Sequence, residues 1–139
     1  MAGACLAVLA VAAPPALAAR RAYVAGAYAG RVRQSIPHTY TGSIGFDIHG
    51  SILTNLHFRV DMVCGKFLLA QVTSPPSPVH VKVNPAGAFA YSGTMRGAHV
   101  DLRGKLQGRS AKGTFFESFH TSPQNACTMY RPAPFGAGH

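Results

Sequence analysis

The chain has 139 residues and a formal net charge of +9, from 13 Lys and Arg against four acidic residues. Its length corresponds to one ordinary domain, and its charge favours polyanionic partners: anionic lipid headgroups, anionic wall polymers or nucleic acid. The cations never form a run of four, so the charge is equally consistent with plain solubility. The chain has no tryptophan, which disfavours a carbohydrate hydrolase that stacks sugars on aromatic rings.

Residues 1–19 are apolar from end to end and stop at a pair of arginines. The run is short for a membrane span and rich in Ala and Pro. It ends in Ala16-Leu17-Ala18, the small-x-small form that precedes a signal-peptidase site, although no Lys or Arg stands before Arg20. We therefore expect a removable signal peptide and an exported protein. The alternative is a buried strand or helix of the mature fold.

Cysteine usage agrees with export. Loss of the leader removes Cys5 and leaves Cys64 and Cys127. An even pair in an exported chain is normally a disulfide, so we predict a bond between these two residues. A metal site or a nucleophile is the alternative, but the two thiols have neither a CxxC spacing nor an adjacent histidine.

The clearest predicted element is a β-hairpin from Ala98 to Phe119. Val100, Leu102 and Leu106 alternate with polar residues, a period of two that is typical of a half-buried strand. Residues 107–110 are polar and contain a glycine, which favours a reversal of the chain. Two strands alone are marginal in water, so the apolar face of this hairpin predicts a second layer.

A second alternating pair covers residues 43–48 and 52–62, with a turn at 49–51. Eleven residues of alternation predict a long strand with one solvent-exposed face. The residues expected to share its apolar face are Ile52, Thr54, Leu56, Phe58, Val60 and Met62.

Shorter elements surround these two pairs. Residues 73–78, TSPPSP, are expected to be a connection because proline cannot donate to a ladder. Residues 132–139 have few anchoring side chains and are expected to form a flexible tail. The other predicted strands are 23–33, 67–72 (or one helical turn), 79–83, 89–91 and 129–130.

No stretch shows the 3.6-residue apolar spacing of a helix, and the glycines and prolines fall mostly between the predicted strands. The sequence thus predicts an all-β domain over residues 20–131: an antiparallel β-sandwich or a small β-barrel of about eight strands. The alternation of polar and apolar residues is consistent with both architectures.

The order of several short motifs resembles that of short exported all-β proteins of bacteria that carry a leader peptide and two cysteines. The motifs are structural glycines, aromatics and cysteines at Gly26–Gly30, Ile44–Phe46, Cys64, Gly87–Phe89, Gly104–Gly108, Ala111–Thr114 and Cys127. These proteins have no assigned activity, so the resemblance implies a fold and an exported location but no catalytic residue.

Few groups of residues in the sequence indicate a catalytic or cofactor-binding site. No nucleophile elbow, phosphate loop or dinucleotide fingerprint is present, and we predict no cofactor and no metal site. His99 and Asp101 stand two apart on one strand face, where they could share a proton or a metal, but neighbouring cations disfavour a divalent ion. A small hydrolase using Asp61, Asp101 or Glu117 with a histidine is the enzymatic alternative.

The remaining candidate is a cationic surface. The side chains predicted to bind an anion are Arg59, Lys66, Lys82, Arg103, Lys105, Arg109 and Lys112. We therefore expect a non-enzymatic domain that binds an anionic polymer or a membrane surface at or outside the cell envelope. A structural subunit that pairs with copies of itself through exposed strand edges is a third hypothesis.

Overall fold

The structure is a computed structural model that describes residues 20–35, 39–66, 68–120 and 126–139. These residues form strands and no helix. The strands are β1 (Gly26–Gln34), β2 (Tyr40–His49), β3 (Ile52–Cys64), β4 (Leu68–Ser77), β5 (Val81–Lys82), β6 (Ala88–Met95), β7 (Ala98–Gln107), β8 (Ser110–His120), β9 (Ala126–Thr128) and β10 (Ala133–Gly138).

Six of the strands close into a barrel. Their order is β10-β1-β2-β3-β9-β8, and β8 pairs with β10 to complete the ring. Strands β7 and β6 continue the sheet beyond β8, while β4 and β5 pair with β3. Every pairing of these strands is antiparallel. The all-β antiparallel prediction is therefore confirmed, and of its two forms the structure adopts the barrel.

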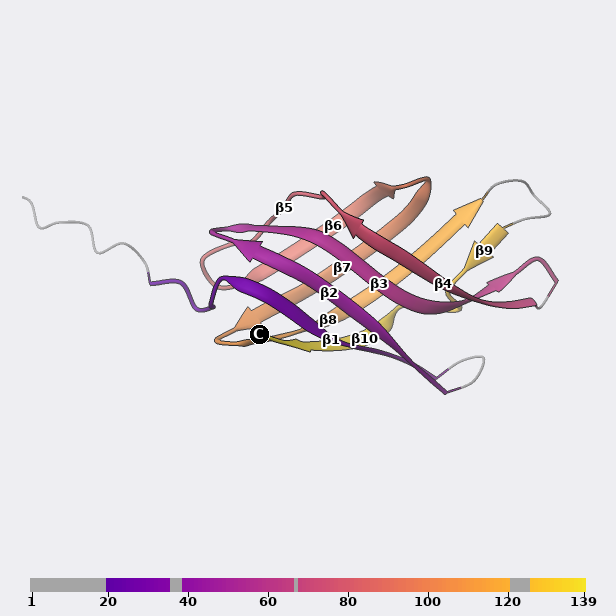
Figure 1. Cartoon of the computed structure of the whole chain (residues 1–139), viewed down its shortest axis with the longest axis horizontal. Coiled ribbons are helices and arrows are strands. Elements are labelled where there is room, and N and C mark those ends of the chain that lie inside the picture. The colour runs from indigo at the N-terminus through magenta and orange to yellow at the C-terminus, as the bar shows by residue number, and fades with distance from the viewer. Residues whose placement is uncertain (1–19, 36–38, 67, 121–125) are drawn as a thin grey trace, which may run out of the picture.

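The core lies between two layers of strands. Figure 1 shows β2 and β3 crossing β7 and β8 at an angle. Side chains from both layers meet inside, and Phe58 of β3 lies 4.5 Å from Phe115 of β8 between ring centroids. Phe46 of β2 contacts Phe89 of β6 in the same way, at 6.0 Å. The predicted hairpin of β7 and β8 thus receives the second layer that its apolar face requires.

The disulfide lies where the barrel closes. Strand β9 pairs with β3 at only two positions, Val63 with Thr128 and Cys64 with Cys127. The two cysteines of the second pair are bonded to each other. The predicted disulfide is confirmed, and a covalent bond reinforces the shortest pairing in the ring.

The tail predicted over residues 132–139 is wrong. Residues Ala133–Gly138 are β10, which lies between β1 and β8. Ala133, Phe135 and Ala137 are buried, and the residues between them are exposed. This alternation was present in the sequence, but small residues and a proline disguised it.

The connection predicted over residues 73–78 is also wrong for most of its length. Strand β4 runs through it to Ser77 and contains Pro75 and Pro76. Proline is tolerated there because β4 pairs with β3 and has no partner strand on its other side. Both prolines also lie in the register shift between the pairs Leu56–Ser77 and Phe58–Ser74, where neither is paired with a residue of β3.

One face of β3 differs from the predicted alternation. A bulge displaces the register between β2 and β3, and Asn55 at the bulge has a positive φ of 53°. Leu53 is fully buried in place of the predicted Ile52 and Thr54, which are only partly buried. Beyond the bulge, the alternation from Leu56 to Met62 faces the core as predicted.

The predicted signal peptide, residues 1–19, lies outside the described residues. Within the described part of the chain, no helix is long and apolar enough to cross a membrane.

Replacing Cys64 and Cys127 with alanine should lower the free energy of unfolding by about 4 kcal/mol, because the bridge spans 63 residues and restricts the unfolded chain. Urea unfolding followed by circular dichroism measures the change. Reduction of the wild-type protein should lower its stability to the same level. Equal stability of the oxidised wild type and the double variant would contradict the structural role of the bond.

Candidate anion-binding surface

The seven cations predicted to bind an anion do not form one cluster. Four of them, Arg59, Arg103, Lys105 and Lys112, lie on the outer wall of the barrel in β3, β7 and β8. The other three lie in different places: Lys66 in the turn after β3, Arg109 in the turn after β7, and Lys82 in β5. The sequence therefore predicted which strand faces carry these cations, but it did not predict which of the cations lie next to one another.

Strand register brings part of this set together with a cation that the sequence analysis missed. Across neighbouring strands the paired residues are Lys105, Lys112, Gly136, Arg31, Ser43 and Arg59. All six are exposed. We call the four charged members, Arg31, Arg59, Lys105 and Lys112, the cationic row. Because adjacent strands lie about 4.8 Å apart, the row extends roughly 24 Å along the curved wall.

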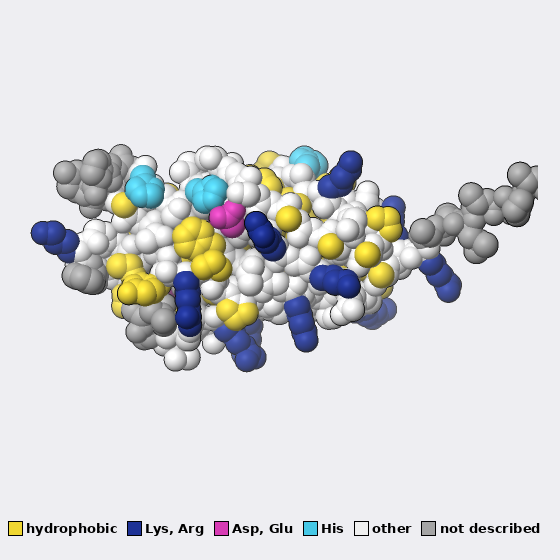
Figure 2. Space-filling model, turned by 180° about the vertical axis from the view of Figure 1, so that it is seen from behind, with side chains coloured by type: hydrophobic (Ala, Val, Ile, Leu, Met, Phe, Trp, Pro, Cys, Tyr) yellow, Lys and Arg dark blue, Asp and Glu magenta, His cyan; other side chains and the backbone are white. Residues whose placement is uncertain are grey.

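Two lysines stand directly opposite each other at one end of the row. Lys105 and Lys112 are cross-strand partners, and like charges in this arrangement repel. Neither makes an ion pair with any carboxylate of the described residues. Figure 2 shows Lys and Arg side chains scattered over one face of the molecule, with only a small acidic area beside a histidine. A bound anion would relieve the repulsion between the two lysines.

The other end of the row borders a shallow depression. Arg31 and Arg59 flank about 490 Å³ of open space, with Ser43 between them. Part of its lining is bare backbone at Gly42, where an added Cβ would lie 2.0 Å from the carbonyl oxygen of Arg59. Two guanidinium groups and a hydroxyl around one hollow suit a phosphate, sulfate or carboxylate group.

Arg59 is held in place by a short chain of hydrogen bonds. Its Nε donates to Oε1 of Gln71 at 2.7 Å, and Nε2 of Gln71 donates to the Tyr40 hydroxyl. This arrangement uses one of the five guanidinium N–H groups. The other four make no hydrogen bond to a described side chain, so they can donate to a ligand in the depression.

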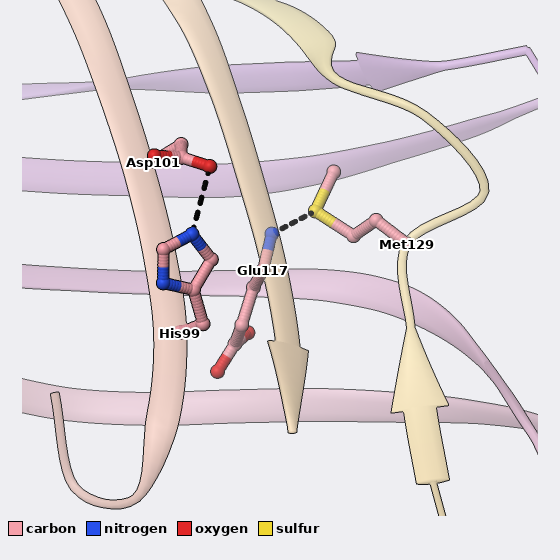
Figure 3. Close-up of polar contacts among 4 residues, drawn as sticks. All are labelled: His99, Asp101, Glu117 and Met129. Atoms are coloured by element: carbon pink, nitrogen blue, oxygen red, sulfur yellow. Dashed lines mark hydrogen bonds and ion pairs between the residues drawn. The ribbon is translucent and has the colours of Figure 1, made fainter. Parts of the chain in front are cut away.

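The predicted pairing of His99 with Asp101 is present on the outer wall of β7. Nε2 of His99 lies 3.0 Å from Oδ2 of Asp101, and both side chains are exposed (Figure 3). The pKa of Asp101 is lowered, first by a hydrogen bond from Ser92 and then by His99. Nowhere in the described ranges do three or more His, Cys, Asp or Glu side chains gather as metal ligands do.

Glu117 has a different environment from the other acidic residues. It lies on the same buried face of β8 as Phe115, with 4% of its surface exposed, and no described residue hydrogen-bonds to its Oε2 atom. Burial raises its pKa to about 7. Asp101 points outward from the neighbouring strand, so these two carboxyl groups lie on opposite sides of the sheet and cannot act together as a catalytic pair.

Removal of the charge at Glu117 should change how stability depends on pH. The carboxyl has an ordinary pKa of 4.5 when unfolded and about 7 when folded, so the folded state binds the proton more tightly. Stability should therefore fall as pH rises from about 4.5 to 7, by at most about 3 kcal/mol, and then level off. In the Glu117→Gln variant this part of the slope should disappear.

Urea unfolding of both proteins at a series of pH values measures the difference between them, and Asp101→Asn serves as a control that should keep the slope. Glu117 is the single glutamate of the chain, so ¹³C-labelled glutamate gives one carboxyl resonance whose midpoint reports its pKa directly. A midpoint near 4.5 would contradict the burial argument.

No family model, curated protein or solved structure matches this chain. The resemblance to short exported bacterial proteins thus stays a prediction.

Proposed function

We propose that this chain is an exported, non-enzymatic barrel domain that binds an anionic polymer outside the cell through the cationic row. The observation that carries the proposal is the strand register, which aligns Lys105, Lys112, Arg31 and Arg59 on one path around the wall. The net charge of +9 adds long-range attraction. The disulfide and the leader-like residues 1–19 support an oxidising location outside the cytoplasm.

A polymer fits the row better than a membrane does. The row follows a curved wall across six strands, from β7 to β3, so a flat bilayer would touch only part of it at one time. A flexible chain can bend along the wall and place successive anionic groups at each cation. None of the exposed large apolar side chains, Val24, Leu68, Leu69 and Tyr130, belongs to the row, which gives a membrane no apolar anchor there.

Self-association through the edge of β4 has less support. The edge strand β4 contains Pro75 and Pro76, which have no N–H to donate to a second copy. Arg96 from the turn between β6 and β7 also occupies this edge, where its Nη2 donates to the carbonyl oxygen of Pro76 at 3.2 Å.

Binding to dextran sulfate, measured by isothermal titration calorimetry across a range of salt concentrations, tests the proposal. Replacing all four cations of the row with glutamine should weaken binding by about tenfold or more and flatten its salt dependence, because fewer counterions are released.

A matched control removes four charges elsewhere: Lys66, Lys82, Arg109 and Arg131, each replaced by glutamine. This control has the same net charge as the row variant and should bind nearly as tightly as the wild type. Equal weakening in both variants would show that net charge alone acts, which would overturn the row. Binding to phosphatidylglycerol vesicles without binding to dextran sulfate would replace the polymer with a membrane surface.

A further inference from the structure

A pocket of about 340 Å³ opens between the free side of β4 and the hairpin of β6 and β7. Its lining is mostly apolar, with Val72 from β4, Met95 from β6, and Ala98 and Phe119 from β7 and β8. The pocket exists because β4 and β6 are not paired with each other. It lies apart from the cationic row, since it shares no residue with the depression between Arg31 and Arg59.

Glu117 supplies a carboxyl group to this pocket. The group is nine-tenths buried, and its Oε2 atom has no hydrogen-bond partner among the residues that the structure describes. The backbone of Glu117 is fixed independently: its N–H donates to the Met129 sulfur at 3.2 Å, and its carbonyl oxygen accepts from the Met129 N–H at 2.9 Å. Figure 3 shows the carboxyl group directed away from Met129.

The other groups around the pocket do not neutralise this carboxyl. β4 contributes Val72, Thr73, Ser74 and Pro75, none of which is charged. Among the described residues that line the pocket, the charged ones are Glu117 and Arg96. Arg96 lies in the turn between β6 and β7 and donates to the carbonyl oxygen of Pro76. His99 and Asp101 of β7 bond to each other on the outer wall. A carboxylate here therefore lacks a cationic partner in the described protein.

We propose that this pocket binds a small organic amine, with the ammonium group on the Glu117 carboxylate and the hydrocarbon part against Val72, Met95 and Phe119. An ammonium group offers three hydrogen-bond donors and one positive charge, which are what a buried, unpartnered carboxylate lacks. The apolar walls would shield the pair from water and bind the rest of the ligand by its hydrocarbon surface. The ligand proposed for this pocket is a cation, whereas the ligand proposed for the cationic row is an anion.

The proton on Glu117 competes with the amine. An alkylamine stays protonated from pH 5.5 to 8, so over this range the carboxyl of Glu117 controls its binding. With the pKa near 7, the ionised fraction falls about thirtyfold between pH 8 and pH 5.5. Affinity for the amine should fall by the same factor.

The full chain is titrated with hexylamine at pH 8 and pH 5.5, with hexanol as the uncharged probe, while the single glutamate resonance is followed by ¹³C NMR. Hexylamine should lower the pKa of Glu117 and bind about thirtyfold more weakly at pH 5.5, and hexanol should do neither. An unchanged pKa in the presence of hexylamine, or equal binding of the two probes, would overturn the proposal.

Three variants locate the site. Glu117→Gln should weaken hexylamine binding at least tenfold at pH 8. Ala98→Leu, which fills the pocket but keeps the carboxyl, should weaken binding as well, and Asp101→Asn, which removes an exposed carboxylate from the adjoining strand, should leave it unchanged. Unchanged binding in Ala98→Leu would place the amine elsewhere, and this test holds even where Glu117→Gln fails to fold.

Discussion

Closure of the ring between β3 and β8 is the constraint on which the rest of the barrel depends. Strand β9 fills this gap with three residues, and it pairs with β3 at only two of them. Backbone hydrogen bonds alone give little cohesion over so short a contact, and the Cys64–Cys127 bond lies at this point. The long strands on either side can therefore remain curved around one core, with Phe58 and Phe115 in contact across it.

Much of the fold could be predicted because alternation is a local property. The hairpin of β7 and β8 and the pairing of β2 with β3 followed from spacing within the sequence, and the disulfide followed from the two cysteines that remain after the leader. The errors have local physical causes. At Asn55 one extra residue in β3 shifts the alternation of buried and exposed side chains. The composition of the segment does not indicate this bulge. In β4, prolines that usually end a strand are tolerated because the strand is an edge and its register with β3 shifts at these residues.

The candidate sites depend on properties that a single sequence does not contain. Arg31 was not predicted as an anion-binding residue because its segment has the pattern of a Gly-rich strand. Its alignment with Arg59 appears only when β1, β2 and β3 are placed in register. Glu117 alternates in phase with Phe115, so its inward direction could be inferred. Its burial could not, because it depends on side chains from β4 and β6 that lie far away in the chain.

The two edge prolines have a consequence for a protein that binds along a polymer. Many copies attached to one chain would reach a high local concentration, a condition that promotes fibril growth in proteins with long, unprotected strand edges. Pro75 and Pro76 interrupt the run of amide donors that a growing fibril needs. The β4 edge is thereby suited to crowding on the ligand without seeding aggregates.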